Sequence, residues 1–304
     1  MPRKSSNVRL LRPADAEAVV ALDRRRSGRS RAGFYSRRFQ ALAGDSRAFV
    51  AVGAEQDREL AGFAFARILD GEFGSAAPVG VLDAIGVLPQ AERAGLATGL
   101  LAALTKELSE RGAGELRTQA DWTEHGMAGF LSASGFRLSP RVVLERALDV
   151  PAGDDPDAEE LPVRSMAEAD LGEIIRLDRK ITGRDRTGYL SRKAREVLRE
   201  SGIRVSLVAE REGRLAGFLM ARLDYGEFGR TEPAAILDTI GVDPAQGRRK
   251  IGRALLGQLL QNLESLRVER VLTEVEWDRL PLLGFLERAG FRHAQRLAFE
   301  KIIA

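Results

Sequence analysis

The 304-residue chain contains no cysteine and only two histidines, His125 and His293. The lack of cysteine excludes disulfides, thiolate metal sites and cysteine nucleophiles. Two histidines are too few to favour a histidine-built metal centre or a Ser-His-Asp triad, so we expect no metal site. Catalysis, if the protein is an enzyme, must rest on carboxylates, tyrosine, lysine, the backbone or bound water.

Long apolar runs and a strong net charge are also missing. No apolar run approaches the roughly 18 residues of a membrane span, and the N-terminal MPRKSSNVRL lacks the apolar segment of a signal peptide. We therefore expect a cytoplasmic protein without a membrane partner. The 47 basic residues nearly balance the 44 acidic ones, and the basic residues form no patch interleaved with aromatics, so nucleic acid is not an expected partner.

The chain repeats itself at an offset of 155 residues. Residues 60–88 and 215–243 are identical at 16 of 29 aligned positions, and Trp122 pairs with Trp277 in the same register. One repeat of half the chain indicates duplication of a whole domain, because a solenoid would show more and shorter repeats. The acidic, proline-bounded stretch 150–161 has little to bury and is typical of a linker. We predict one domain at 1–149 and a second at 162–304.

Each half shows the same order of expected elements: a strand, two helices, three strands, a helix, a strand, a short helix and a last strand. The third of the three strands runs through a short loop into a helix expected to begin at Leu96 or Ile251. This order predicts an α/β (α+β) fold with two domains, each a mixed, mostly antiparallel sheet with helices on both faces. We expect each half to build its own sheet and the halves to pack as an intramolecular pseudo-dimer, which leaves the chain a monomer.

A strand that delivers a loop to a helix N-terminus offers a phosphate site, because the first helical N–H groups lack partners. Glycine at position 95 permits close backbone approach, whereas lysine at position 250 adds a cation, and we favour the second loop. The candidate binding residues of the first half are Val87, Arg93, Ala94, Gly95, Leu96, Ala97 and Thr98. Those of the second half are Ile240, Val242, Gly247, Arg248, Arg249, Lys250, Ile251, Gly252 and Arg253.

The residues that carry a family resemblance are a V-x-P at the end of the strand, a G-[IL]-[GA]-like helix start and a G-F before the last strand. Together with the element order, they resemble the GNAT superfamily of N-acyltransferases, twice in one chain. The resemblance implies that acetyl-CoA is the co-substrate. Its pyrophosphate would lie on the loop and helix start, and its pantetheine arm between two splayed strands. A primary amine, on a small molecule or a protein, would attack the thioester directly.

The resemblance also implies a general acid that this sequence lacks. Many family members carry a tyrosine four residues before the glycine of the G-F pair, where this chain has Leu131 and Leu286. Tyr225 is a candidate substitute. Without an acid, both repeats could instead form a non-catalytic CoA-binding sensor or scaffold, and this alternative stays open.

Four repeated carboxylates are the candidate catalytic residues. Asp83 and Asp238 interrupt apolar strands, so each is either a functional group or half of a structural ion pair. Glu72 and Glu227 belong to a repeated GEFG segment beside the expected cleft, where the simpler interpretation is a solvated turn. We assign proton removal through water to Glu227 and positioning to Asp238. The two tryptophans are expected to pack in the core or at the rim.

Overall fold

The computed structural model describes residues 6–70, 78–92, 95–148, 161–196, 198, 205–224, 226–230, 234–247 and 249–303. Several residues singled out from the sequence lie outside this part of the chain: Glu72, Arg93, Ala94, Tyr225, Arg248 and the linker residues 150–160. No helix in the described ranges is long and apolar enough to cross a membrane.

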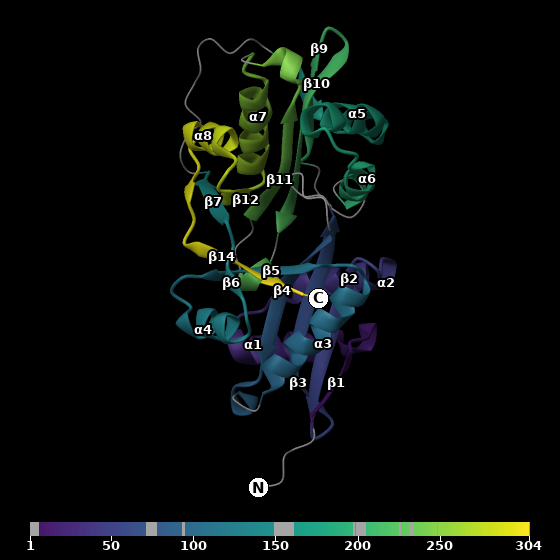
Figure 1. Ribbon diagram of the computed structural model, residues 1–304, viewed down its shortest axis with the longest axis vertical. Coiled ribbons are helices and arrows are strands. Elements are labelled where there is room, and N and C mark those ends of the chain that lie inside the picture. The colour runs from purple at the N-terminus through teal and green to yellow at the C-terminus, as the bar shows by residue number, and fades with distance from the viewer. Residues whose placement is uncertain are drawn as a thin grey trace.

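The two halves contain the same elements in the same order (Figure 1). The first half comprises β1 (Ser6–Leu10), α1 (Ala16–Ser27), α2 (Ala32–Gly44), β2 (Phe49–Gln56), β3 (Glu59–Asp70), β4 (Pro78–Val87), α3 (Leu96–Glu110), β5 (Glu115–Asp121), α4 (His125–Ala133), β6 (Arg137–Leu138) and β7 (Arg141–Ala147). The second half comprises β8 (Val163–Ser165), α5 (Leu171–Thr182), α6 (Thr187–Arg195), β9 (Leu207–Arg211), β10 (Arg214–Asp224), β11 (Ala234–Val242), α7 (Ile251–Ser265), β12 (Arg270–Glu276), α8 (Leu280–Arg288), β13 (Arg292–His293) and β14 (Arg296–Ile302). The helix starts at Leu96 and Ile251 are as predicted.

The described strands form two seven-stranded mixed sheets. Their orders are β1-β2-β3-β4-β5-β14-β6 and β13-β7-β12-β11-β10-β9-β8. In each sheet only the central pair is parallel, β4 with β5 and β11 with β12. The predicted α/β class with mostly antiparallel sheets is confirmed.

The two halves exchange their last strands. Strand β7 of the first half pairs with β12, and β14 of the second half pairs with β5. The expectation that each half builds its own sheet is therefore wrong for the last strand of each half. Figure 1 shows the C-terminal end of the chain lying against the sheet of the first half. A pattern of alternating apolar residues predicts a strand but does not specify its partner, because either central strand accepts the same edge.

Each exchanged strand also caps a helix of the other half. Lys301 on β14 donates from Nζ to the carbonyl of Ser134 at 2.8 Å, just after α4 ends. Arg146 on β7 donates to the carbonyl of Ala289, just after α8 ends. Cations are favoured at helix C-termini, where unpaired carbonyls and the negative end of the dipole meet. The exchange therefore satisfies backbone groups as well as completing the sheets.

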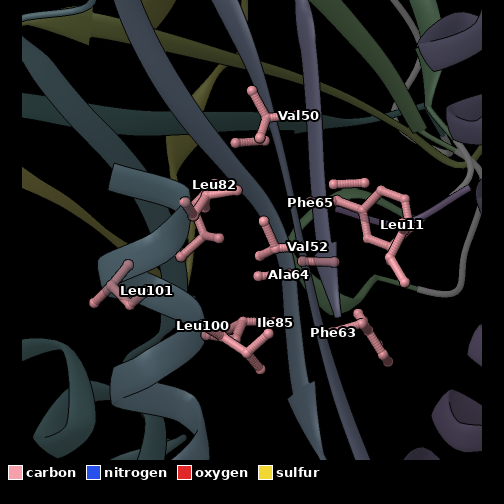
Figure 2. Close-up of a cluster of buried hydrophobic side chains, with 14 of the residues drawn as sticks. Leu11, Val50, Val52, Phe63, Ala64, Phe65, Leu82, Ile85, Leu100 and Leu101 are labelled. Carbon is pink, nitrogen blue, oxygen red and sulfur yellow. The ribbon is translucent and has the colours of Figure 1, made fainter. Parts of the chain in front are cut away.

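Helices cover both faces of each sheet, as the binary pattern predicted. The leucines of α3 are buried against β2, β3 and β4, and Figure 2 shows Leu100 next to Ile85, with Val52 and Leu82 above them. On the opposite face, α1 and α2 contact β2, β3 and β4. The second half repeats this layering with α7 on one face and α5 on the other.

Candidate active site

The central parallel strands part at the same place in both halves. Strand β4 pairs with β5 only over Val79–Val81, and β11 pairs with β12 only over Ala234–Ile236. At the point of parting, Thr118 Oγ1 donates to the Leu82 carbonyl at 2.9 Å. Thr273 Oγ1 makes the same bond to the Leu237 carbonyl, also at 2.9 Å. The later halves of β4 and β11 thus present a backbone edge without a strand partner on that side among the described residues.

A bulge marks the start of each free edge. The register of β10 with β11 passes from Leu237 to Thr239, so Asp238 is the extra residue of a β-bulge. The register of β3 with β4 skips Asp83 in the same way. A bulge re-aims the side chains that follow it and ends regular pairing. It explains how a carboxylate can stand in an apolar strand.

Beyond the bulge, neighbouring residues face opposite sides of the sheet. Ile240 and Val242 pack toward α7, and Val242 lies 3.7 Å from where a Cβ on Gly252 would stand. Gly241 instead faces α5, where a Cβ would meet Ile181 at 2.9 Å. Val87 of the first half likewise belongs to the core on the α3 side. The predicted lining residues Ile240, Val242 and Val87 therefore lie along the splayed strands.

The loop beyond each splayed strand ends at a helix start without a side-chain cap. Gly95 precedes α3 with φ +78°, and Lys250 precedes α7 with φ +55°. Glycine has no side chain to cap the helix, and the lysine side chain carries only donors and makes no capping bond to the first helical N–H groups. Such N–H groups, with the positive end of the helix dipole, form a ready anion site.

Some of the remaining predicted binding residues are buried in the cores, and others are exposed cations. Leu96 and Ile251 are buried in the two cores, so only their backbone can face a ligand. In the second half Arg249, Lys250 and Arg253 are exposed around the helix start, beside Gly247 and Gly252. In the first half the described residues Gly95, Ala97 and Thr98 bring no charge. The second loop therefore has the stronger positive field.

The three repeated carboxylates that the structure describes, Asp83, Asp238 and Glu227, lie in a buried charge cluster between the halves rather than in an open cleft. The Asp83 carboxylate lies 3.0 Å from Arg38 Nε and 3.3 Å from Arg67 Nε. Burial raises the pKa of Asp83 to about 6, against the opposing pull of both arginines. Asp238 has matching partners, Lys193 at 3.2 Å and Arg222 at 3.4 Å. Both aspartates are therefore halves of ion pairs.

Glu227 occupies the centre of this cluster. Arg67 Nη1 and Nη2 donate to its two oxygens at 2.6 and 2.9 Å, and Arg222 does the same at 2.8 and 2.9 Å. Burial alone would raise the pKa of Glu227, but Arg222, Arg67 and Arg38 together hold it well below its usual range. With 2% of its surface exposed and such a low pKa, this carboxylate is a weak proton acceptor. These contacts favour a structural role for Glu227 over proton removal.

The segment around Glu227 also covers part of the first half. Its short 3-10 helix, η6 (Glu227–Gly229), contacts β4 and β5. Arg31, which directly precedes α2, donates to the carbonyl of Gly226 at 2.9 Å, and Arg296 of β14 donates to that of Phe228 at 2.9 Å. The parted strands of the first half are thus covered by the second half on the side away from α3.

A small cavity of about 70 Å³ lies between the halves where the strands part. It is lined by residues of both halves, among them Thr118, Gln119, Asp238, Thr273 and Glu274. Since one water needs roughly 10–15 Å³ by this measure, the cavity has room for a few waters. Its lining also includes Glu227 of the charge cluster, so the cavity borders both the cluster and the threonines at the two points where the strands part.

Polar groups that the sequence analysis did not single out lie beside β11. The hydroxyl of Tyr189 on α6 and Oγ1 of Thr239 are 2.9 Å apart, and both residues are buried. The matching positions of the first half are Phe34 and Ala84, so a comparison of the repeats could have found this pair. Leu131 and Leu286, where the family tyrosine would stand, are 1% exposed core residues and offer no acid.

The tryptophans and histidines lie at the surface. Trp122 and Trp277 directly follow β5 and β12 and are 53% and 56% exposed, which fits the rim and not the core. His293 lies beside Trp277, with ring centroids 6.3 Å apart, and His125 begins α4. Both histidines are exposed, so neither lies in the charge cluster.

Comparisons with known proteins match this architecture. The model of the acetyltransferase (GNAT) family matches residues 17–136 and again residues 173–291. A mycothiol acetyltransferase of Thermobifida fusca strain YX is 27% identical over 303 residues, which is 91% of this chain and 87% of the relative.

Two solved structures show the same fold. A tandem GNAT protein from the clavulanic acid biosynthesis pathway has a TM-score of 0.66 at 15% identity, with 99% of both chains covered. The GCN5-related glucosamine N-acetyltransferase region of a fungal multi-domain GH3 beta-N-acetylglucosaminidase has a TM-score of 0.68 at 16% identity. The match covers 98% of this chain and 38% of that protein. On the family match, which includes both halves, this chain belongs to the GNAT acetyltransferase family and carries the family's domain twice.

Proposed function

We propose that this protein transfers an acetyl group from acetyl-CoA to a primary amine of a small molecule or a protein. The observation that carries the proposal is the pair of parted parallel strands, β11 and β12, next to the uncapped start of α7. A strand edge with free backbone groups can hold an extended chain such as a pantetheine arm, and a helix start can hold its pyrophosphate. The relative's name supports acetyl as the group moved.

We infer that the second half performs the reaction. Its helix start is surrounded by Arg249, Lys250 and Arg253, whose charge favours a pyrophosphate. Among the described residues, η6 of the second half packs against β4 and β5, where it would hinder an acceptor in the first half. The first half would then serve to hold the charge cluster and to supply β7 to the second sheet.

In this account the residues of the second half bind and orient the reactants. The α7 N–H groups and the cations beside them bind the pyrophosphate, and an N–H of the free β11 edge polarises the thioester carbonyl. The amine nitrogen attacks that carbon, the C–S bond breaks, and the electron pair leaves on sulfur. Asp238, held by Lys193 and Arg222, fixes the bulge that sets the free edge.

The acceptor amine must lose a proton, and we infer that water takes it. The small cavity that Asp238 and Thr273 line has room for a few waters at the point where the strands part. A water chain is a sufficient path because it needs no single strong base at the reaction site. Glu227 would then stabilise the junction of the halves rather than accept the proton.

A non-catalytic CoA-binding scaffold is the second candidate, favoured by the apolar residues at both family acid positions, Leu131 and Leu286. Release of free thiol from acetyl-CoA with a panel of primary amines separates the two functions. Amine-dependent thiol release supports the transferase. Tight acetyl-CoA binding without release for any amine would support the scaffold.

A further inference from the structure

The buried hydroxyl pair of Tyr189 and Thr239 stands beside the free edge of β11. Thr239 directly follows the bulge residue Asp238, and its Oγ1 lies 2.9 Å from the Tyr189 hydroxyl. The two residues are 4% and 5% exposed. When Tyr189 is the donor of this bond, Thr239 keeps its own O–H proton, so the threonine hydroxyl can serve as a donor next to the parted strands.

The phenol ring is held in place from its other side. The guanidinium carbon of Arg186 lies 4.7 Å from the centre of the Tyr189 ring, and Arg186 Nε donates to Asp178 at 3.1 Å. Stacking by a fixed cation limits the ring to one position. The hydroxyl is thus directed at β11 by α5 and α6 together.

The first half shows that the fold does not require these hydroxyls. It keeps the buried pair of Asp23 and Arg31, with Arg31 Nη2 2.5 Å from Asp23 Oδ1, but places Phe34 and Ala84 where the second half has tyrosine and threonine. Burying two hydroxyls costs free energy that their mutual bond only offsets. Since the first half buries an apolar residue at each matching position, packing alone does not require the two hydroxyls.

We propose that Thr239 delivers a proton to the sulfur that leaves from acetyl-CoA, and that Tyr189 supplies this proton to Thr239. The proposal rests on the transferase function and fills the role left empty at Leu286. As the C–S bond breaks, sulfur takes the Thr239 hydroxyl proton and Thr239 takes that of Tyr189. The phenolate regains the proton that the amine lost, through water, so charge and protons balance. In this scheme Thr239 touches the reacting atom and Tyr189 is a positioning residue.

The test compares two acetyl donors that differ only in the leaving atom, acetyl-CoA and its selenoester analogue. A selenol is much more acidic than a thiol, so selenolate leaves without needing a proton. Hydroxylamine serves as the acceptor because it is small and uncharged at pH 7. Donor consumption is followed for the wild type, Tyr189→Phe, Thr239→Val and the matched control Tyr35→Phe, with enzyme-free rates subtracted. Tyr35 is a fully buried tyrosine of the first half that binds Arg31 at 2.8 Å.

Loss of an acid should slow turnover of acetyl-CoA by about a hundred-fold in Tyr189→Phe and Thr239→Val. The same variants should stay within about three-fold of the wild type with the selenoester, and binding of acetyl-CoA should not change. Tyr35→Phe should match the wild type with both donors. An equal loss with both donors, or no loss, would overturn the proposal. A wild type inactive with both donors, for hydroxylamine and for every amine of the panel above, would contradict the transferase function itself, before any variant is compared.

Discussion

Glu227 and Arg67, which lie 160 residues apart in the chain, form a two-point ion pair with distances of 2.6 and 2.9 Å across the junction of the halves. Arg222 holds the same carboxylate from the second half at 2.8 and 2.9 Å. One buried carboxylate therefore joins two arginines that the repeat places at equivalent positions.

Replacing Glu227 with glutamine should destabilise the fold. The change leaves buried guanidinium groups without their counter-charge, and breaking a buried pair in this way costs about 3–5 kcal/mol. Urea unfolding at pH 7 measures the loss. The control Glu264→Gln, on an exposed face of α7, should stay within about 0.5 kcal/mol of the wild type.

The same variant also tests the base assigned from sequence. A general base typically contributes a hundred-fold or more to turnover, so a catalytic Glu227 would show that loss in a variant of unchanged stability. We expect the reverse pattern, in which the well-folded fraction keeps turnover within about ten-fold.

Asp83 and Glu227 should give the free energy of unfolding opposite pH dependences. Burial raises the pKa of Asp83 to about 6, above its ordinary value of 3.8. As the pH falls, the folded state therefore binds a proton at Asp83 at a higher pH than the unfolded state does. Protonation of Asp83 should raise the free energy of unfolding by about 1 kcal/mol between about pH 7 and about pH 5. Asp83→Asn should remove this gain in urea unfolding across that range.

The carboxylate of Glu227 should lower the free energy of unfolding as the pH falls, which is opposite to the effect of Asp83. Its folded pKa lies well below the ordinary 4.5, so its stabilisation is present above that value and is lost as the pH falls through the folded pKa. Acid unfolding below about pH 4 should therefore be less steep in Glu227→Gln. Parallel pH curves for the wild type and both variants would contradict the charges assigned to the cluster.

Lys250 should lower the stability of the fold through its backbone conformation and strengthen acetyl-CoA binding through its charge. Its backbone has φ +55°, a left-handed conformation that costs a residue with a side chain about 1 kcal/mol. Lys250→Gly should raise the free energy of unfolding by about that amount while weakening acetyl-CoA through loss of the cation. Calorimetry measures both effects. A glycine variant that binds acetyl-CoA more tightly would show that the lysine does not contact the pyrophosphate.

Charge reversal tests which loop is used. Arg249→Glu with Lys250→Glu should weaken acetyl-CoA binding ten-fold or more, because it reverses the charge next to the pyrophosphate. Arg93→Glu reverses the cation of the first loop and should have little effect. The opposite result would assign the working site to the first half.

A chain of residues 1–149 should not fold as a monomer. It contains β7, whose partner β12 belongs to the second half, and it lacks β14, which pairs with β5. Two copies can satisfy both needs by exchanging β7, so light scattering should show a dimer of the half and a monomer of the full chain. A folded monomeric half would show that the last strand can return to its own sheet.

The sequence predicted the fold where local pattern determines it. The repeat, the leucine spacing and the helix starts at Leu96 and Ile251 follow from periodicity and turn chemistry. The exchanged strands and the role of Glu227 did not follow, because both depend on contacts more than 100 residues apart, such as Arg67 with Glu227. The pair of Tyr189 and Thr239 could have been found from the sequence only as a difference between the two repeats, since the first has Phe34 and Ala84 at the matching positions.

The central claim is that acetyl-CoA binds to the second half along β11 and α7. A crystal structure with acetyl-CoA tests it most directly. The account predicts pyrophosphate at the backbone N–H groups that follow Lys250, pantetheine between β11 and β12, and the thioester next to Thr239. Acetyl-CoA bound only between β4 and β5, or at neither pair of parted strands, would contradict it.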